Sequence, residues 1–431
     1  MLRLHIENIL DREEKIMAEW VERKISDIGT VVGGATPSTK KPENYEDGEI
    51  AWITPKDLST FSGRYIERGG RNITEIGLKS CSTQLLPPNT VLFSSRAPIG
   101  YVAIAANEVC TNQGFKSVIP NENTDPLFLF YLLKYNKDKI EGMGSGTTFK
   151  EVSGNTMKNI VVNVPTDKKV QEKIAAILGS IDDKIEENEQ INNNLERQAQ
   201  ALFKSWFVEF EPFNGTMPSD WEIVPLEKIA DFQNGYAFKS KELLNEQSPN
   251  CYQVFKQGHI ARGGGFIPDG TKSWYPKSIA SKLEKFVLKK GDILMAMTDM
   301  KDNVAILGNT AVMPLDNEYI VNQRVGHLRA NGYKGVTYPF IYLLTNSTDF
   351  LVDLRSRANS GVQVNLSSSE IKASQTVLPS EEVNNAFSEI TLPMFEIIIN
   401  NQLENQRLAQ LRDTLLPKLM SGKLDVSNIE I

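Results

Sequence analysis

The sequence has few of the residues that build disulfides and most structural metal sites, with three cysteines and three histidines among 431 residues. The cysteines lie far apart, are odd in number and form no Cys-x-x-Cys motif, which argues against a disulfide framework and is typical of a reducing compartment. The histidines are equally scattered, so a zinc cluster of ordinary ligand spacing is not expected. We therefore expect no metal site. The residues concerned are Cys81, Cys110, Cys251, His5, His259 and His327.

Long hydrophobic runs are also missing. No stretch approaches the roughly 20 consecutive apolar residues that a membrane-spanning helix needs. The first residues lead into the charged residues 11–15 without an apolar segment typical of a secretion signal. We expect a cytoplasmic protein that has no contact with a membrane.

The sequence lacks the motifs of nucleotide and catalytic chemistry. It has no Gly-x-x-x-x-Gly-Lys-Ser/Thr loop, no Asn/Asp-Pro-Pro-Tyr/Phe methyltransferase motif and no nucleophile elbow. The glycine-rich residues 142–146 and 263–265 do not stand between a strand and a helix, so we interpret them as loops. Residues 13–15 fit the Glu-x-Lys of nucleases, but no Pro-Asp precedes them. The sequence therefore predicts a recognition module rather than an enzyme.

The net charge is −7, with 47 basic and 54 acidic residues. This total excludes a uniformly basic coat, because proteins of that kind neutralise phosphates with a large positive field. Residues 20–165 carry +1 and residues 212–379 carry +2, whereas residues 1–19, 166–211 and 380–431 carry −2, −4 and −4. A localised basic face therefore stays open for the first two segments. The acidic segments suit spacers or surfaces that dock a protein.

The chain contains an internal repeat with a period of just over 200 residues. Four matches occur in the same order, and four such matches with a slowly drifting offset are hard to obtain by chance. We infer two homologous halves. The matching segments are residues 20–29 and 221–230, 86–93 and 288–295, 111–115 and 321–325, and 145–165 and 360–379.

Each half begins with about 145–160 residues of mixed pattern, rich in Gly, Pro, Asn and Ser turns. Short apolar runs inside these segments predict strands at residues 90–93 and 101–105 in the first half. Their counterparts in the second half are residues 292–295 and 304–307. A helix opened by proline is predicted in both halves, at residues 126–133 and 339–344.

Each half ends in a long helix whose apolar residues step by threes and fours, which is a coiled-coil signal. The first, from Asp167 to about Phe203, would be roughly 55 Å long at ~1.5 Å per residue. Gly179 and Pro393 are candidate kinks. A buried Asn in such a seam can fix register and partner. Ordinary bundle helices are the alternative interpretation. The predicted spacer residues are Ile174, Ile181, Ile185, Asn188, Ile191 and Leu195 in the first helix, and Ile390, Ile397, Asn401, Leu408 and Leu411 in the second.

Basic residues of the mixed segments cluster in Gly- and Ser-rich loops, including residues 64–71 and 272–290. Asn and Gln can pair with adenine and Arg with guanine in the major groove, while Lys and Arg on flanking loops hold phosphates. Solvated surface loops are an equal alternative for any one of these residues, and the Asn-Gln pairs could instead cap turns. The candidate DNA-binding residues are Lys40, Lys41, Arg68, Arg71, Lys79, Arg96, Asn112, Gln113, Lys116, Lys150, Lys239, Lys241, Lys272, Lys277, Lys282, Lys301, Asn322, Gln323, Arg324, Gln363 and Asn365.

The arrangement resembles the specificity subunits of Type I restriction-modification systems over nearly the whole chain. The most specific motifs end the two long helices. The acidic residues 1–19 depart from the family plan, as either a short helix or a disordered tail. The motifs are Ala201-Leu202-Phe203-Lys204-Ser205-Trp206-Phe207-Val208-Glu209-Phe210-Glu211-Pro212 and Leu415-Leu416-Pro417-Lys418-Leu419-Met420-Ser421-Gly422-Lys423-Leu424.

The resemblance implies an α+β fold, with two pseudo-repeated mixed α/β target-recognition domains separated by two long antiparallel coiled-coil helices. We expect an N-terminal extension at residues 1–19, recognition domains at 20–165 and 212–379, and spacer helices at 166–211 and 380–431.

The resemblance also implies that each domain reads one half of a bipartite, asymmetric site in double-stranded DNA, and that helix length sets the gap. Two methyltransferase subunits and the restriction subunits would dock on this non-catalytic chain. S-adenosylmethionine, ATP and Mg²⁺ would bind to those partners. A specificity subunit of a Type IIB or phage-exclusion system shares every feature used here, and a coiled-coil protein-interaction scaffold is the alternative of another class.

Overall fold

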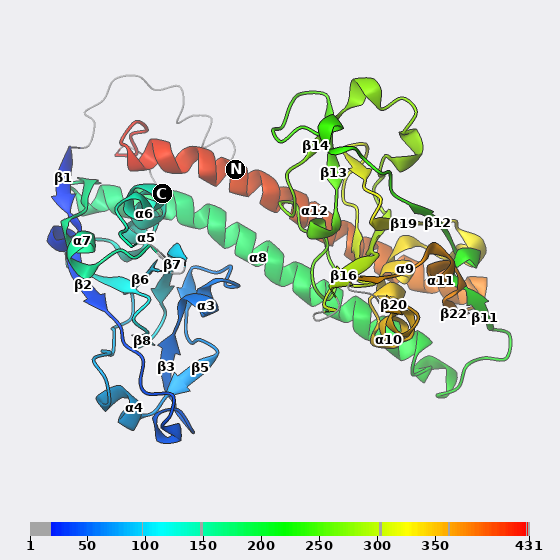
Figure 1. Ribbon diagram of the computed structural model, residues 1–431, viewed down its shortest axis with the longest axis horizontal. Helices are drawn as coiled ribbons and strands as arrows, with labels where there is room; N and C mark the ends of the chain where they lie inside the picture. Colours follow the sequence, from blue (N-terminus) through cyan, green and yellow to red (C-terminus); the bar gives the residue numbers. More distant parts are fainter. Residues whose placement is uncertain are drawn as a thin grey trace. The chain divides into compact units, whose positions relative to one another are not determined.

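A computed structural model describes residues 19–96, 98–146, 150–300, 304–360, 363–427 and 429 (Figure 1). The chain divides into two compact units, which comprise residues 1–186 with 406–431 and residues 187–405. Each unit holds one β-rich domain and parts of two helices of 40 residues, α8 (Lys168–Phe207) and α12 (Glu381–Met420). The predicted extension lies outside the described residues, except for Glu19.

The first domain contains a five-stranded sheet of order β2-β9-β6-β7-β4 and a three-stranded sheet of order β5-β3-β8. A separate antiparallel pair, β1 with β10, sets Trp20 opposite Pro165 and so brings the two ends of the domain together. The strands are β1 (Trp20–Lys24), β2 (Gly29–Gly33), β3 (Ile50–Ile53), β4 (Tyr65–Ile66), β5 (Arg71–Ile73), β6 (Val91–Ser95), β7 (Ile99–Ala105), β8 (Cys110–Thr111), β9 (Lys116–Pro120) and β10 (Val161–Pro165).

The apolar helix of the first domain begins where the sequence predicts it. Asp125 caps it by accepting the Phe128 N–H, and Pro126 supplies its first residue. Six consecutive residues of this helix are buried, because sheet and long helix cover it from different sides. The helices of this domain are α2 (Ile25–Ile28), η1 (Pro42–Asn44), α3 (Pro55–Leu58), α4 (Glu75–Lys79), α5 (Pro126–Tyr135), α6 (Lys137–Gly142) and α7 (Gly154–Asn159).

The second domain repeats this plan with sheets β12-β19-β15-β17, β14-β13-β18 and β16-β21-β20, and a closing pair of β11 with β22. The strands are β11 (Glu222–Pro225), β12 (Ala230–Asn234), β13 (Cys251–Phe255), β14 (Trp274–Pro276), β15 (Ile293–Ala296), β16 (Thr298–Met300), β17 (Thr310–Val312), β18 (Tyr319–Val321), β19 (Val325–Ala330), β20 (Asn359–Ser360), β21 (Gln363–Asn365) and β22 (Gln375–Leu378).

The helices of the second domain include the predicted proline-opened helix, α9, in which Pro339 is the second residue. The helices are η2 (Glu211–Phe213), η3 (Leu226–Lys228), η4 (Ser240–Glu242), η5 (Gln257–His259), η6 (Lys277–Ile279), η7 (Glu284–Phe286), η8 (Tyr333–Gly335), α9 (Tyr338–Thr345), α10 (Thr348–Ser356) and α11 (Ser368–Ala373).

One predicted strand of the second domain is wrong. Residues 304–307 form bends and turns, and the strand β17 begins only at Thr310. The carboxylate of Asp299 accepts backbone N–H groups from Ala305, Ile306 and Leu307, at 2.7, 2.7 and 3.2 Å. These donors are therefore taken by a side chain, which leaves none of them for a neighbouring strand.

The helix-end motifs that resemble the specificity family lie in the two hydrophobic cores. Phe203 and Phe207 of α8 pack on Phe340 of α9 and Phe387 of α12, with ring centroids 4.8–6.2 Å apart. In the other unit Leu415, Leu419 and Met420 join the core of the first domain. The last turn of each long helix is thus part of a domain core, which explains why both motifs are so apolar.

In the second unit α8 and α12 meet through a layer of asparagines. Asn188, which is 1% exposed, donates to the Glu404 carboxylate at 2.8 Å and to the Asn405 side chain at 2.9 Å. Asn401 donates to Asn192 at 2.9 Å. Rising numbers in α8 meet falling numbers in α12, so the contact is antiparallel. Because a buried amide that loses its partner is costly, this layer fixes one register.

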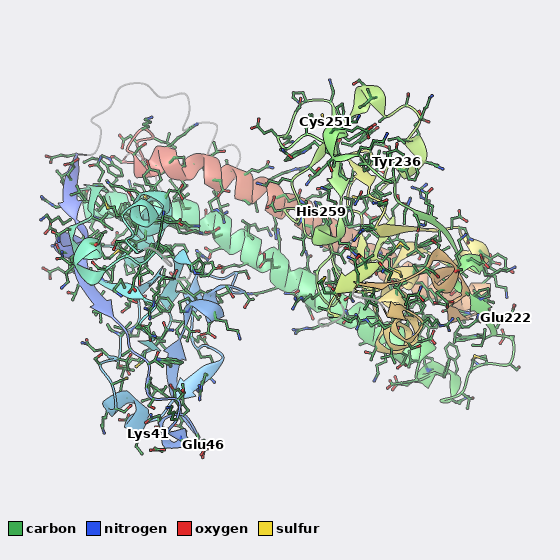
Figure 2. The ribbon with its side chains drawn as sticks, viewed as in Figure 1. Lys41, Glu46, Glu222, Tyr236, Cys251 and His259 are labelled. Carbon is green, nitrogen blue, oxygen red and sulfur yellow. The ribbon has the colours of Figure 1, made fainter. Side chains whose placement is uncertain are left out.

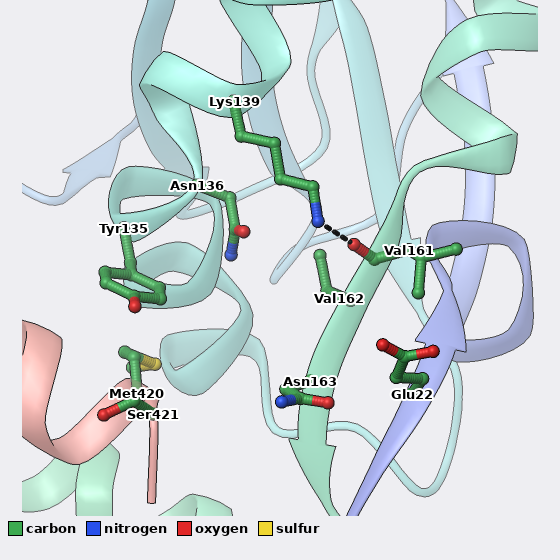
Figure 3. A pocket seen from close by; sticks show the side chains of 9 residues that line it. All are labelled: Glu22, Tyr135, Asn136, Lys139, Val161, Val162, Asn163, Met420 and Ser421. Atoms are coloured by element: carbon green, nitrogen blue, oxygen red, sulfur yellow. Dashed lines mark hydrogen bonds between the residues drawn. The ribbon is translucent and has the colours of Figure 1, made fainter. Parts of the chain in front are cut away.

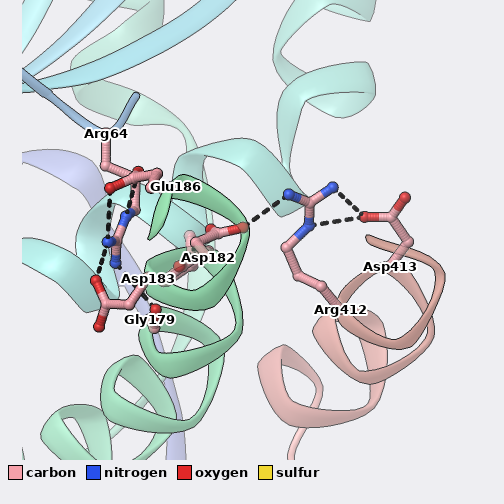
Figure 4. Close-up of polar contacts among 8 residues, drawn as sticks. Arg64, Gly179, Asp182, Asp183, Glu186, Arg412 and Asp413 are labelled. Carbon is pink, nitrogen blue, oxygen red and sulfur yellow. Dashed lines mark hydrogen bonds and ion pairs between the residues drawn. The ribbon is translucent and has the colours of Figure 1, made fainter. Parts of the chain in front are cut away.

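In the first unit an aspartate of α8 holds the domain and α12 together. Asp182 accepts from the Tyr131 hydroxyl of α5 at 2.6 Å and from Arg412 of α12 at 2.8 Å (Figure 4). Asp182 is 5% exposed, so these two donors replace the water that an exposed carboxylate would bind. Burial and the nearby Asp182 carboxylate raise the pKa of Tyr131 above its usual value, which keeps the hydroxyl a donor.

Arg64 attaches the first domain to α8. The expectation that residues 64–71 form a basic loop is therefore wrong for this arginine. Its guanidinium is buried and pairs with Asp183 and Glu186, and it donates to the Gly179 carbonyl at 3.2 Å (Figure 4). Burial opposes the charge, but the hydrogen bonds to the two carboxylates outweigh it and raise the pKa of Arg64. A Cβ on Gly179 would lie 3.3 Å from this guanidinium, so the glycine admits the arginine and does not end the helix.

The predicted seam needs a correction in the second unit. Ile191, Ile390 and Ile397 are 38%, 41% and 45% exposed, whereas Phe395 and Ile398 are buried. The prediction assumed a period of 3.5, but a helix of 3.6 residues per turn drifts by about 20° per heptad. Over several turns the buried stripe therefore moves on by one position. Pro393 does not end α12.

Removing Arg412 should destabilise the first unit. Arg412→Met leaves the buried Asp182 carboxylate with Tyr131 alone, and we expect a loss of about 1–3 kcal/mol in the free energy of unfolding. Chemical denaturation would measure it. The double variant Asp182→Asn with Arg412→Met should recover part of the loss, because the amide needs no cation. Arg407→Met, on an exposed position of α12, is the control; equal effects of the two single variants would contradict the role of Arg412.

Candidate nucleic-acid interface

Both domains contain the same tight turn, which begins at Asn112 in the first domain and at Asn322 in the second. In each domain a glycine packs against this turn. Residue Gly34 lies so close to the turn that a Cβ would sit 2.1 Å from the Thr111 carbonyl oxygen. Gly34 is also 2.4 Å from the Asn112 carbonyl oxygen by the same measure, and Gly235 meets the two matching oxygens, of Val321 at 2.8 Å and of Asn322 at 2.1 Å. Only glycine allows this approach. The asparagine N–H groups also match: Asn112 donates to Ile53, and Asn322 donates to Phe255, both at 3.0 Å. The turns are therefore equivalent residue by residue.

In the first domain the turn lies beside a stacked arginine. The guanidinium of Arg71 lies 3.5 Å from the centre of the Tyr45 ring. The Tyr45 hydroxyl donates to the Pro37 carbonyl at 2.6 Å, and the Trp52 indole donates to the Ala35 carbonyl at 3.1 Å. These contacts tie the loop that carries Lys40 and Lys41 to the three-stranded sheet. A cation held by a ring keeps its charge, which suits an approaching phosphate.

The predicted base-reading pair of the first domain divides into two roles. Asn112 uses its side-chain oxygen to accept the Gly114 N–H at 2.8 Å, so it caps the turn, as the alternative interpretation held. Gln113 is exposed and receives a hydrogen bond from the Thr36 hydroxyl. No described residue receives a hydrogen bond from its amide N–H₂ group, which leaves these donors for a base. Thr36 was not singled out from the sequence.

Three of the predicted cations of the first domain have carboxylate partners. Arg96 and Lys116 share Glu151, at 3.2 and 3.4 Å, and Lys79 pairs with Glu75 at 3.4 Å. These pairs are partly or fully exposed, so each stabilises the fold by less than about 1 kcal/mol and is easily exchanged for a phosphate. Within the described residues, no ion pair is formed by Lys40, Lys41, Arg68 or Lys150. Figure 2 shows Lys41 and Glu46 at the end of the domain farthest from α8.

The second domain presents lysines around an aromatic cluster that sequence reasoning missed. Tyr236, Phe238, Tyr275 and Phe286 pack with ring centroids 4.9–5.5 Å apart. Lys277 lies 4.8 Å from the centre of the Tyr252 ring and 3.9 Å from Glu318. In the described part of the domain, ion pairs are absent for Lys239, Lys241, Lys272 and Lys282, all of which are exposed. Figure 2 labels Tyr236 and Cys251 in this part of the domain.

Three of the remaining polar candidates of the second domain meet at the sheet of order β16-β21-β20. Arg324 donates to the Gln363 side-chain oxygen at 3.1 Å. Asn365 donates to the Gln363 carbonyl at 3.0 Å. Asn322 and Gln323 precede Arg324 in the same turn, and Gln323 is exposed. Lys301, predicted as a neighbour, lies outside the described residues.

A histidine of the second domain replaces an aspartate of the first at the equivalent turn. Asp57 accepts the Thr54 N–H at 2.7 Å after β3, and His259 accepts the Lys256 N–H at 3.1 Å after β13. His259 is fully buried and stacks on Phe255, with centroids 5.0 Å apart. The sequence could have indicated this role, because Asp57 and His259 lie at the same offset as other repeat matches.

A pocket of the first unit is lined by none of the candidate DNA-binding residues. It has a volume of about 400 Å³ and lies between α5, α6, β1, β10 and the end of α12 (Figure 3). Lys139 crosses its wall to donate to the Val161 carbonyl at 2.7 Å. In the described ranges, no group of three or more His, Cys, Asp or Glu side chains is arranged to hold a metal ion. Nor is any helix among the described residues long and apolar enough to cross a bilayer.

Comparison with known proteins explains the repeated plan. The model of the family described as "Type I restriction modification DNA specificity domain" matches residues 17–197 and again residues 218–412. The chain belongs to this family. It is 33% identical to the Type I restriction enzyme MjaIX specificity subunit of Methanocaldococcus jannaschii, over 96% of both chains. It is 26% identical to the HindI specificity subunit of Haemophilus influenzae, over 95% of this chain and all of the other.

The solved S subunit of M. genitalium has the same fold, with a TM-score of 0.60 at 18% identity, covering 95% of this chain and 98% of the other. The α+β fold with two repeated domains and long helices is thus confirmed. The chain is a DNA-recognition subunit of a Type I restriction-modification system, and specificity subunits are non-catalytic.

Acid should weaken the second domain through His259. Burial lowers the pKa of His259 below its usual value, and the ring accepts the Lys256 N–H only while Nδ1 carries no proton. Between the lowered pKa and ~6.5 the unfolded chain binds a proton that the folded domain does not, so the free energy of unfolding falls as pH falls. Denaturation at a series of pH values would show this slope.

His259→Gln should flatten that slope, since glutamine does not titrate. The carboxylates titrate equally in both proteins, so the difference between the two curves isolates the histidine. Identical slopes would show that His259 does not cause the pH dependence.

Proposed function

We propose that each domain reads one half of a bipartite, asymmetric DNA site and that α8 and α12 set the gap between the halves. The observation that carries this proposal is a common turn with different side chains. At equivalent positions the first domain has Gly114 and the second has Arg324. Two copies of one framework with unlike contact residues suit two unlike half-sites.

Within each domain, the exposed lysines would hold phosphates and the turn residues would face base edges. Support comes from their chemistry: the unpaired lysines are spread over loops, whereas Gln113, Gln323 and Arg324 follow the tight turn. Phosphate contacts fix register without sequence information, and base contacts supply it. The low net charge of each domain suggests modest affinity for the chain alone.

The two long helices would act as the ruler between half-sites. Each extends for about 60 Å at ~1.5 Å per residue. The asparagine layer supports a fixed register, because a shift by one turn would leave Asn188 buried without Glu404 and Asn405.

Other subunits would carry the catalytic steps. We propose that two methyltransferase subunits dock on the helices and domains of this chain and that restriction subunits join them. S-adenosylmethionine, ATP and Mg²⁺ would then be cofactors of those partners, and assembly would take place in the cytoplasm. The acidic helices support a protein-docking role, because they carry little that attracts phosphates.

Methylome sequencing tests the proposed function directly. A host that carries this chain with its methyltransferase should show one methylated motif made of two different half-sites with a fixed gap. The physical reason is the divergence of contact residues on a shared framework. A host with the methyltransferase alone is the control and should lack the motif. A palindromic or continuous motif would contradict the proposal.

Shortening both helices together tests the ruler. Deleting residues 187–193 and 399–405 removes seven residues from each helix and takes out both sides of the asparagine layer. Each helix loses about 10 Å, which equals about 3 base pairs at 3.4 Å per pair, so the gap should shorten by that amount.

Deleting only one of the two segments is the matched control. The remaining asparagines would then face apolar or unmatched partners, and we expect assembly to fail. A double-deletion variant that assembles and methylates with an unchanged gap would show that the helices are not the ruler.

A further inference from the structure

Arg324 stands where the framework of the first domain has no side chain. Ser95 donates its N–H to the Gly114 carbonyl, and Met297 donates to the Arg324 carbonyl, at 2.7 and 3.3 Å. One strand further, Val152 donates to Ser95 and Leu366 to Met297, at 3.0 and 2.9 Å. Two successive hydrogen bonds thus match in the two domains. The backbone position is shared, and the guanidinium belongs to the second domain alone.

Three other arginines of this domain are used within the fold, whereas Arg262 is exposed in a turn and forms no ion pair with a described residue. Arg329 forms two hydrogen bonds with the buried Asp292, at 2.6 and 2.7 Å, and Arg357 pairs with Asp353 at 2.8 Å. Arg355 donates to the Leu307 carbonyl at 2.9 Å. Each is held by a carboxylate or by the backbone, so none of them offers a free fork of N–H donors to a ligand.

Arg324 is oriented without being neutralised. It is exposed, and its Nη1 donates to the uncharged amide oxygen of Gln363 at 3.1 Å. Within the described residues it forms no ion pair. An arginine held by an amide loses side-chain freedom in advance but keeps its full charge and its remaining N–H groups. This is the arrangement that bidentate recognition requires.

Gln363 is itself fixed by the sheet. It lies on β21, where it pairs with Met300 of β16, and Asn365 donates to its carbonyl at 3.0 Å. The neighbouring Val364 is buried and anchors the strand. The backbone that carries this amide is therefore held in place, and the amide oxygen is engaged by Arg324.

We propose that Arg324, positioned by Gln363, reads a guanine in the half-site of the second domain. The guanidinium would donate to O6 and N7 on the major-groove edge of the base, which is the pairing that its fork geometry fits. This inference rests on the proposed division of the site between the domains. It adds that the first domain, with Gly114, reads no base at the equivalent position.

The methylome of variants tests this assignment, with wild type as reference. Arg324→Ala should relax one G·C position in one half-site, with the preference for guanine falling roughly 10- to 100-fold. The other half-site and the gap should not change, and they show that the bipartite reading itself is intact. Arg324→Lys keeps the charge but not the fork, so it should relax the same position. Gln363→Glu would neutralise the guanidinium and should do likewise.

Arg262→Ala is the matched control, since it removes an exposed arginine of the same domain that forms no ion pair among the described residues. It should leave the motif intact. Thermal unfolding would verify that all variants fold. An unchanged methylated motif in Arg324→Ala would overturn the assignment. A phosphate contact is the other contrary result: Arg324→Lys would then behave like the wild type, and Arg324→Ala would bind all DNA sequences more weakly to the same degree. A wild-type methylome without any motif of two half-sites would instead contradict the proposed function.

Discussion

The hydrogen bonds to Asp182 join three elements that are far apart in the sequence. Tyr131 comes from the first domain, Asp182 from α8, and Arg412 from α12, near the end of the chain. A buried carboxylate is stable only when donors surround it, so the domain and both helices must be in place together. Arg64 adds a second attachment one and four residues further along the same helix, through Asp183 and Glu186. The first domain is thus attached to α8 and α12 by buried polar contacts.

In the second unit, different residues attach the domain to the two long helices. Tyr342 of α9 occupies the place of Tyr131 in the repeat and donates to Glu196 of α8 at 2.6 Å. Its ring packs on Phe395 of α12, with centroids 5.4 Å apart. A carboxylate again accepts a hydrogen bond from a buried tyrosine hydroxyl, but an aromatic ring takes the place of the ion pair with Arg412. The repeat preserves the attachment while the residues that provide it diverge, as the turn residues do.

Features with a local signal could be predicted from the sequence. The repeat, the two long helices and the proline-opened helices follow from spacing and composition, and the structure has these helices, although α12 ends at Met420 and the predicted spacer segment ran to residue 431. Features that depend on a contact with a residue outside the local segment could not be predicted. The strand expected at residues 304–307 failed because Asp299, outside the run, takes its N–H groups. The seam moved by one position because a real helix drifts from a period of 3.5.

The candidate site shows the same division between local and tertiary information. Many lysines of the Gly-rich loops are exposed, since composition alone keeps lysine at the surface, and their contact with DNA stays a prediction. Whether an arginine faces solvent or the core depends on its partners: Arg64 and Arg71 lie in one basic run, yet one is buried against two carboxylates and the other stacks on Tyr45. A charge run by itself does not distinguish these two outcomes.

The small net charge of the recognition domains understates the field that they present to DNA. Asp57 and Asp125 cap helices, Asp299 accepts three backbone N–H groups, and Asp292 is buried between His327 and Arg329. Burial raises the pKa of Asp292, but the hydrogen bonds from His327 and Arg329 outweigh it, and the pKa lies below its usual value. These negative charges are compensated within the fold. Several lysines of the loops, among them Lys40, Lys41 and Lys239, form no ion pair with any described residue, so a domain of charge +1 or +2 can still offer a basic face.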